Sequence, residues 1–250
     1  MYNFFIESEN RHGDYYVITG SDFNHIKNVL RMKQGDTFLV SENGKSSLCC
    51  LESFDGESVI AKITEEDFQD TSLPVKIYLF QGLPKSDKME LIIQKAVELG
   101  ADTIIPVEMS RCVVKLDDKK KKSKVQRWQS ISESAAKQSK RTAIPEICDV
   151  MSFKQAIKAA AELDHFLVPY ENKEGMKATK EALNTIKSGD SVGIFIGPEG
   201  GFDESEINAA INAGGKAISL GKRILRTETA AITAVGMCML HIEMNIGGDE

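Results

Sequence analysis

Two glycine-rich segments of the chain combine residue types that could bind a ligand. The first, residues 194–207, reads IFIGPEGGFDESEI, in which a buried-strand pattern ends at Gly197 and a turn leads directly into a capped helix. Glycines let a ligand lie against the main chain, and a helix start presents free N–H groups. A plain strand–helix connection can also contain glycine, but it needs neither this much glycine nor Glu199. We therefore favour ligand binding over a simple connection.

The second segment, residues 219–231, reads SLGKRILRTETAA and also follows a predicted strand. Arg226 stands beside the predicted start of the last helix, near Thr227, where the helix dipole disfavours a cation. It is therefore expected to have an anionic partner, which could be Glu199, Glu228 or an RNA phosphate. Glu228 could equally be a favourable acid in the first turn of the helix. Because ligands bind at the carboxyl ends of parallel strands, the two segments together predict one crevice.

Several other kinds of site are excluded by the sequence. No GxGxxG follows a strand, and NGKSS lacks the first glycine of a phosphate-binding loop. There is no CxxC or HExxH, and the four histidines are scattered, so no metal site is expected. The five unpaired cysteines and the absence of a signal-like N-terminus or a run of about 18 apolar residues favour a reduced, cytoplasmic protein without a membrane partner.

The charge is distributed unevenly along the 250 residues. The chain has 31 basic and 37 acidic side chains, a net charge of −6, with 42% hydrophobic residues. Residues 1–72 carry 6 basic and 13 acidic groups, whereas residues 111–141 carry 11 basic and 3 acidic groups, a local charge of +8. Such a local field can attract phosphate on an acidic protein. For the Lys-rich stretch 117–124 alone, a solvated helix face is the favoured interpretation.

The pattern of elements changes near residue 72 and predicts two domains, 1–71 and 72–250. The first shows short strand patterns at 15–20, 36–41, 47–54 and 58–64, with a short helix from Ser21 or Asp22 to Met32, which is typical of a small β-barrel or sandwich. The second alternates apolar runs at 75–80, 103–109, 165–170, 191–197 and 216–221 with helical patterns. This alternation predicts an α/β domain with a mostly parallel sheet flanked by helices.

The helix starts and the last helix are indicated by local patterns. Capping-box spacing occurs at Asp87 and Glu90, at Ser152 and Gln155, and at Asp203 and Glu206. The last segment, ETAAITAVGMCMLHIEM, is apolar on nearly all sides. It is therefore expected to be buried all round, either in the core or against another subunit.

At this point the residues resemble a known family. IGPEGGFDESEI followed by LGKRILRTETAA resembles the signature pair of the RsmE family, 16S ribosomal RNA uridine-N3 methyltransferases of the SPOUT class. LPKSDKMELIIQKAVELGADTIIPVEMSRCVV, SESAAKQSKRTAIPEI and HIKNVLRMKQGD are similar to the family as well. The resemblance covers nearly the whole chain, and the Lys-rich stretch 117–124 departs from it.

The resemblance implies a fold, a cofactor and partners. It implies a PUA-like β-barrel that binds RNA in residues 1–71, a SPOUT methyltransferase domain with a deep trefoil knot in 72–250, and a homodimer with its active sites at the subunit interface. S-adenosylmethionine would be held in the knot by three loops. The implied cofactor-binding residues are Val168, Pro169, Gly197, Glu199, Gly200, Leu220, Gly221, Ile224, Leu225, Arg226, Thr229 and Ala230.

The chemistry of uridine methylation suggests roles for the charged residues. The N3 proton must leave, and negative charge develops on O2 and O4 of the base. Arg226 is the candidate to stabilise that charge, and Glu199 or Glu228 is a candidate base, with water as the alternative. Contacts with phosphates of 16S RNA or of the 30S subunit are expected from His25, Lys27, Arg31, Arg111, Lys137, Lys140 and Arg141. For His25 and Arg31, an ordinary place on a surface helix is an equal alternative.

Three other functions are compatible with parts of the pattern. One is a non-catalytic RNA-binding module, which the two intact glycine-rich segments disfavour. Another is methylation of a different RNA. The third is a phosphate-binding α/β enzyme with its anion site at the helix that starts at Asp203, which the acids Asp203 and Glu204 disfavour.

Overall fold

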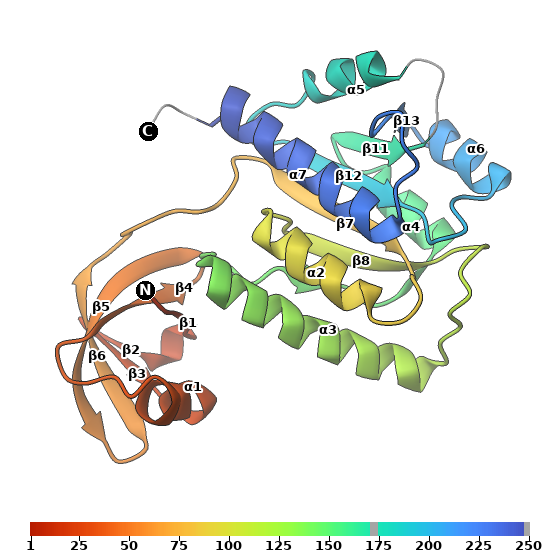
Figure 1. The fold of residues 1–250 in the computed structure, drawn as a ribbon. Coiled ribbons are helices and arrows are strands. Elements are labelled where there is room, and N and C mark those ends of the chain that lie inside the picture. The colour runs from red at the N-terminus through yellow and green to blue at the C-terminus, as the bar shows by residue number, and fades with distance from the viewer. Residues whose placement is uncertain (171–174, 248–250) are drawn as a thin grey trace. The chain divides into compact units, whose positions relative to one another are not determined.

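The computed structural model describes residues 1–170 and 175–247, which divide into two compact units (Figure 1). The first unit comprises Met1–Ser72 and Ala136–Ile144, and the second comprises Leu73–Ala135 and Pro145–Glu250. The domain boundary predicted from the sequence, between residues 71 and 72, places 136–144 in the second domain. Those residues belong to the first unit through contacts distant in sequence, such as the hydrogen bond from Asn3 Nδ2 to the carbonyl of Arg141 at 3.0 Å.

The first unit contains a six-stranded sheet. Its strands are β1 (Asn3–Phe5), β2 (Arg11–His12), β3 (Tyr15–Ile18), β4 (Thr37–Glu42), β5 (Lys45–Asp55) and β6 (Ser58–Glu65), in the order β1-β4-β5-β6-β3-β2. β1 runs parallel to β4, and the other neighbours are antiparallel. Asn43 and Gly44 both adopt positive φ, 50° and 80°, which the tight turn between β4 and β5 requires. The four predicted strands are thus confirmed.

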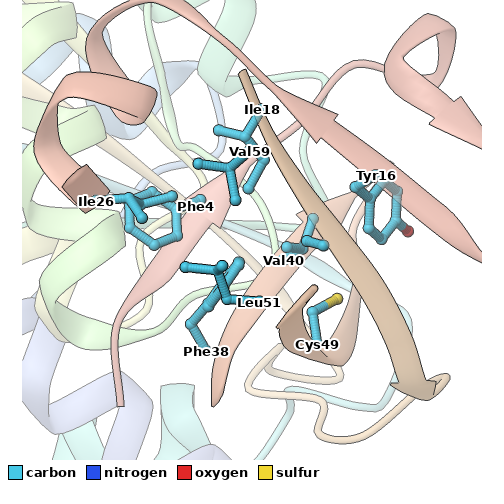
Figure 2. Close-up of a cluster of buried hydrophobic side chains, with 10 residues drawn as sticks. Phe4, Tyr16, Ile18, Ile26, Phe38, Val40, Cys49, Leu51 and Val59 are labelled. Atoms are coloured by element: carbon cyan, nitrogen blue, oxygen red, sulfur yellow. The ribbon is translucent and has the colours of Figure 1, made fainter. Parts of the chain in front are cut away.

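The sheet of the first unit has its own hydrophobic core (Figure 2). Alternate residues of neighbouring strands point to the same face because the side-chain period of a strand is two. The cluster consists of Phe4, Tyr16, Ile18, Ile26, Phe38, Val40, Cys49, Leu51, Val59 and Ala61, all at most 2% exposed. Ile26 comes from the helical segment, which therefore covers this core.

That helical segment is shorter and less regular than predicted. A 3₁₀ turn at Ser8–Asn10 precedes it; α1 itself (Gly20–Asn24) starts after Thr19, and the chain continues as a π-helical turn over His25–Val29. The predicted extension to Met32 is wrong, because Arg31 adopts a φ of 54° that no right-handed helix allows.

The second unit contains a parallel sheet flanked by helices. Its strands are β7 (Lys76–Gly82), β8 (Thr103–Glu108), β9 (Glu146–Ile147), β10 (Met151–Ser152), β11 (His165–Pro169), β12 (Ser191–Ile196) and β13 (Lys216–Ile218). The order is β10-β8-β7-β12-β11-β13, with β9 also paired to β8, and every pair is parallel. The five predicted apolar strands and the predicted fold class are confirmed. The trefoil knot stays a prediction from the resemblance.

Six helices accompany this sheet. They are α2 (Lys88–Glu98), α3 (Asp118–Ser139), α4 (Phe153–Ala160), α5 (Met176–Leu183), α6 (Glu204–Asn212) and α7 (Thr227–Asn245). In Figure 1, α2 and α7 lie side by side across the sheet, where α7 packs on β7 and β12. The strand β12 also carries Phe195, whose ring stacks on Phe80 at 5.2 Å and lies near Phe153 of α4. These aromatic contacts fix the strands that lead to the glycine-rich turns.

Two of the three predicted capping boxes are present. Ser152 and Asp203 cap α4 and α6 through their side chains, with Gln155 and Glu206 bonding back to the cap residues. The predicted box at Asp87 is wrong: the side chain of Asp87 caps nothing. The carboxylate of Glu90 instead forms two hydrogen bonds with Arg127 of α3, at 2.6 and 2.9 Å.

The last helix is buried along one side rather than all round. Ala231, Ala234, Val235, Cys238 and Ile242 of α7 are buried, whereas Leu240 is 51% and Met244 is 74% exposed. Burial in the core of a single chain is therefore wrong for the outer side of α7. The alternative prediction, that the last helix packs against another subunit, applies to this exposed apolar side.

Three further findings concern the cysteines, membrane-spanning helices and metal ligands. All five cysteines are free thiols, and burial raises the pKa of Cys49 and of Cys238 to about 12. Within residues 1–170 and 175–247, no helix has both the length and the apolar character needed to cross a bilayer. In the same described part of the chain, no cluster of His, Cys, Asp or Glu could hold a metal ion.

Candidate methyl-donor and RNA site

The glycine-rich segments follow strands that end at the same edge of the parallel sheet. β11 lies between β12 and β13, and Pro169 at the end of β11 pairs with Ile218 at the end of β13. β12 in turn lies beside β7, so the chain leaves four neighbouring strands at one edge. In an open α/β sheet this carboxyl edge is where ligands bind.

A buried hydrogen bond joins the two glycine-rich segments directly. Thr227, the first residue of α7, donates its hydroxyl proton to the carbonyl of Gly197 at 2.7 Å and is 5% exposed. The hydroxyl also accepts a hydrogen bond from Gln81 Nε2 at the end of β7, at 3.0 Å. The two segments predicted to outline one crevice are therefore side by side.

The GPEGG turn, residues 197–201, needs its glycines for backbone packing. A Cβ atom on Gly197 would lie 3.1 Å from the backbone carbon of Gly201, and Gly201 itself has a φ of 67°. The turn is anchored on its far side by Phe202, which packs against Phe195 of β12. The buried carboxylate of Glu206 accepts hydrogen bonds from the amides of Asp203 and Ser110, so α6 and the loop after β8 hold the turn as well.

The second segment is held at its beginning and exposed in its middle. Thr179 of α5 forms two hydrogen bonds of 2.8 Å with the backbone of Ser219, and Gly221 follows with a φ of 104°. Ile224 is fully exposed, whereas Leu220 and Leu225 are half-buried. Of these three apolar candidates for cofactor binding, Ile224 therefore does not form part of a closed pocket wall in this structure.

The cofactor-binding candidates on β11 and α7 lie at the same edge. Val168 is buried in β11 and Pro169 is half-buried at its end. On α7, Thr229 is exposed and Ala230 is half-buried, and the amide of Ala230 bonds to the carbonyl of Arg226 at 2.8 Å. Gly200 is also exposed, in the turn itself.

The sequence reasoning missed Lys88, which connects both candidate carboxylates. Lys88 Nζ lies 3.1 Å from Glu199 of the first segment and 3.1 Å from Glu228 of the second. These two carboxylates raise the pKa of Lys88, with Glu199 the larger influence. The available signal was its place as the first residue of α2, where a cation is disfavoured unless it has an anionic partner, the same argument that was applied to Arg226.

Both carboxylates are held in their ionised form. Burial raises the pKa of Glu199, but hydrogen bonds from its own amide, from the amide of Lys85 and from Lys88 outweigh burial and lower it below the ordinary value. For Glu228, burial is again outweighed, here by its own amide and by the charges of Lys88 and Arg226. A lowered pKa makes each carboxylate a weaker base.

Arg226 is the N-cap residue of α7, and its side chain is exposed. Two of its three expected partners, Glu199 and Glu228, are ion-paired with Lys88 instead. Among the described residues, no carboxylate forms a salt bridge with Arg226. The third expected partner, an RNA phosphate, is the one this geometry leaves open.

A comparison with known proteins identifies the family. The model of the RNA methyltransferase domain matches residues 71–239, and that of the RNA methyltransferase PUA domain matches residues 18–64. The chain belongs to the RNA methyltransferase family. The ribosomal RNA small subunit methyltransferase E of Bacillus subtilis is 40% identical over 239 residues, which cover 94% of this chain and 93% of that protein.

Solved structures agree with this family. The ribosomal RNA small subunit methyltransferase E of Neisseria gonorrhoeae, bound to S-adenosyl methionine, aligns with a TM-score of 0.80 at 31% identity over 95% of this chain and 96% of that one. A Legionella pneumophila protein in complex with the cofactor SAM aligns with a TM-score of 0.82 at 30% identity, over 95% and 96% of the two chains. The predicted family is thereby confirmed.

Among the residues expected to contact RNA in this RNA methyltransferase, Arg111 and Lys137 pair with carboxylates of the protein. Arg111 Nη1 donates to the carbonyl of Gly200 at 3.0 Å and Nη2 lies 3.5 Å from Asp203, so this side chain steadies the GPEGG turn. Lys137 bonds both carboxylate oxygens of Asp22 in α1, at 2.9 and 3.2 Å. Their charges are partly neutralised before any RNA arrives.

Arg141 does not lie where a phosphate contact was expected. It is 7% exposed, and its carbonyl accepts a hydrogen bond from Asn3. Its charge is evident from the sequence, but its burial is not, because residues 136–144 return to the first unit. The neighbouring Lys140 is exposed and remains available as a contact.

The candidates on the helical segment of the first unit differ among themselves. The ammonium group of Lys27 lies over the rings of Phe23 and Phe54, at 5.0 and 5.6 Å. His25 is half-buried, with its ring against Phe4, whereas Arg31 is exposed. Arg31 and Lys27 are thus the two that present charge on this segment.

The Lys-rich stretch 117–124 forms the start of helix α3. Lys120 pairs with Asp117 at 3.2 Å and Lys121 pairs with Glu108 at 2.8 Å. Part of its charge is therefore balanced within the protein.

Proposed function

We propose that this chain transfers a methyl group from S-adenosylmethionine to N3 of a uridine in 16S ribosomal RNA, within the small ribosomal subunit or its RNA. The hydrogen bond between Thr227 and Gly197 carries the proposal, because it brings the two signature segments of the family together at one sheet edge. The relatives named as ribosomal RNA small subunit methyltransferase E support the substrate.

The residues of the crevice fit such a donor. Gly201 and Gly221 adopt positive φ, and nothing lies within 4 Å of where their side chains would start, so the backbone borders open space. Half-buried Leu220, Leu225 and Ala230 provide apolar surface beside it, as a site with few polar contacts requires. When bound, the sulfonium of the donor supplies an activated methyl group and a good leaving group.

The chain's own residues would act on the acceptor. Arg226, exposed and without a salt bridge among the described residues, would stabilise the negative charge that develops on O2 or O4 as the N3 proton leaves. Glu199 and Glu228 are the candidate bases, but their lowered pKa values and their pairing with Lys88 favour water as the proton acceptor. The Arg226→Ala variant should bind the donor normally and lose turnover; normal turnover would remove this assignment.

The pH dependence of methylation separates the two carboxylates from water. Glu199→Gln and Glu228→Gln should each retain the wild-type dependence on pH if water accepts the proton. Loss of the acidic limb of the rate profile in one of these variants would instead identify that carboxylate as the base.

The RNA contacts are proposed for the exposed cations. Phosphates of the RNA would be bound by Lys27, Arg31 and Lys140 of the first unit. His25, Arg111 and Lys137 would also bind phosphates once they release the groups that they contact in this structure. These contacts would position the RNA. Binding should weaken steeply as salt is added, and an affinity insensitive to salt would contradict these contacts. The first unit, Met1–Ser72 with Ala136–Ile144, would thus provide most of the RNA contacts, and the second unit would transfer the methyl group.

A homodimer is proposed from the exposed apolar side of α7. Ile232, Met237, Leu240 and Met244 form an apolar surface that continues onto Leu99 and Leu183. Such a continuous apolar patch marks an interaction surface, and the resemblance implies that a second copy covers it. Ribosomal subunits are assembled in the cytoplasm, which is therefore the proposed compartment.

Two measurements test the function. Calorimetry with S-adenosylmethionine should detect micromolar binding, whereas a non-catalytic RNA-binding module would bind none. Mass mapping of methylated uridines in ribosomal RNA from cells that lack this chain should reveal one missing N3 methylation in the small-subunit RNA. A complete methylation pattern would refute the proposal.

A further inference from the structure

Gln81 is a buried polar residue in a largely apolar strand of the parallel sheet. It lies near the end of β7, between β8 and β12, and is 0% exposed. Central strands of parallel sheets are normally apolar because helices cover both of their faces. An amide at this position therefore needs a reason beyond the packing of the sheet.

The amide group of Gln81 holds two segments in place. Its Nε2 donates to the carbonyl of Gly82 at 2.8 Å and to the hydroxyl of Thr227 at 3.0 Å. The single hydroxyl proton of Thr227 goes to the carbonyl of Gly197, since a carbonyl only accepts. The hydroxyl must therefore accept from Gln81, which fixes the orientation of the amide and forms a continuous chain from β7 through α7 to the GPEGG turn.

The oxygen atom of the same amide group differs from the nitrogen in its contacts. Gln81 Oε1 is buried and has no hydrogen-bond partner within the described part of the chain. An unsatisfied buried acceptor lowers stability, and an apolar side chain of similar size would avoid that loss. What glutamine contributes is the hydrogen bond donated to Thr227, which orients the Thr227 hydroxyl and, through it, the turn, while the second donated bond to Gly82 holds the amide itself.

We propose that Gln81 is a positioning residue of the donor site, which acts through Thr227 to set the separation between the GPEGG turn and the start of α7. The inference rests on the proposed function, because these two segments are the ones that would enclose the donor. Neither Gln81 nor Thr227 needs to contact the donor for this effect. The end of β7 is then a further structural element of the site, connected through Thr227 to both glycine-rich segments.

Four variants separate positioning from simple packing. Gln81→Met keeps the volume and removes both donated bonds together with the unsatisfied acceptor. Thr227→Val keeps the shape of the side chain and removes the hydroxyl, whereas Thr227→Ser retains it as the matched control. The double variant of Gln81→Met and Thr227→Val tests whether the two residues act as one network.

The expected results follow from a shared hydrogen-bond chain. Donor dissociation constants measured by calorimetry should rise about tenfold in Gln81→Met and in Thr227→Val, stay within about twofold of wild type in Thr227→Ser, and rise little further in the double variant. The melting temperature of Gln81→Met should not fall, since an unsatisfied acceptor has been removed. Wild-type donor affinity in Gln81→Met, or effects that multiply in the double variant, would overturn the inference.

Hydrogen exchange without any donor tests the inference apart from the proposed function. Amides of residues 197–203 should exchange faster in Gln81→Met and Thr227→Val than in wild type and Thr227→Ser. Unchanged exchange would refute the positioning role. If wild type bound no donor while exchange still responded to the variants, the proposed function would fail and the positioning role would stand.

Discussion

Gly82, the last residue of β7, provides a direct test of how closely the GPEGG turn is fitted to the sheet. A Cβ atom added here would lie 2.7 Å from Pro198 Cδ, 2.8 Å from Pro198 N and 2.7 Å from Met109 Sδ. Pro198 is the second residue of the turn, so two of these three close contacts are to a residue that cannot rotate away. The substitution Gly82→Ala should therefore move the turn itself.

The size of the effect follows from these distances. Ordinary contact begins at about 3.4 Å, so Pro198 must move by about 0.7 Å. Overpacking of this kind costs about 1–3 kcal/mol of stability, which is several degrees in melting temperature for a chain of this length. Because a shift of about 1 Å in a bound geometry lowers the rate by up to roughly 100-fold, we expect a loss on the order of tenfold in donor affinity or in methylation.

Gly193→Ala is the matched control within the same sheet. A Cβ on Gly193, in the middle of β12, would meet Leu163 Cδ1 at 2.8 Å and Phe80 Cε2 at 3.3 Å, both of which belong to side chains. It should lower the melting temperature and leave the donor affinity of the folded protein unchanged. Calorimetry and thermal unfolding of the two variants decide the matter: if Gly82→Ala binds the donor as tightly as wild type, the turn is not held by β7.

Three shorter predictions concern charge, capping and assembly. In wild type, the pKa values of Glu199 and Glu228 are lowered, so their ion pairs with Lys88 contribute to stability above about pH 4.5 and are lost as pH falls through the lowered values. Lys88→Met should raise both pKa values, so that donor affinity measured against pH begins to change at a higher pH than in wild type. Coincident curves for the two proteins would contradict the pairing. Ser152→Ala should lower stability by about 1 kcal/mol in thermal unfolding, whereas Asp87→Ala should change it little because that side chain caps nothing; equal losses would be inconsistent with the observed caps. Leu240→Lys should convert a dimer into a monomer by light scattering, and an unchanged mass would exclude α7 from the interface.

Elements that depend on local sequence were predicted well. The strands of the second unit follow from apolar runs, and the caps at Ser152 and Asp203 follow from contacts within one helical turn. The same pattern at Asp87 failed because Arg127, 37 residues away, binds Glu90. Local patterns thus predict a helix start correctly unless a residue distant in sequence competes for the capping group.

Helix α3 was predicted only in part, as a solvated helix face over the Lys-rich stretch 117–124. Its first turns are almost entirely lysine, and its buried positions Trp128, Ser132 and Ala135 have helical spacing but include a serine, so they form no regular apolar stripe. A regular apolar stripe is what identifies a helix from its sequence. The burial of Arg141 could not be predicted from the sequence either, since it arises from the return of residues 136–144 to the first unit.

The candidate site was predicted from glycine content and charge, but the partners of its charges were not. The sequence identified the two segments because their glycines and acids exceed what a connection needs, and the Thr227–Gly197 bond confirms that they meet. The ion pairs of Glu199 and Glu228 with Lys88 could not be predicted from the sequence, since they depend on where the loop after β7 places the start of α2. Spacing along a chain carries no information about such a meeting.

The two cations at helix starts in this site end up in different electrostatic situations. Lys88 begins α2 and Arg226 caps α7, so the helix dipole disfavours both. Lys88 takes both neighbouring carboxylates, which leaves the exposed Arg226 as the cation with no salt bridge among the described residues. A group that must stabilise charge only as the uracil loses its proton should not be neutralised beforehand, since an existing ion pair would have to break first. By pairing with both acids, Lys88 leaves the guanidinium of Arg226 without a salt bridge among the described residues, as the role proposed for Arg226 towards the substrate requires.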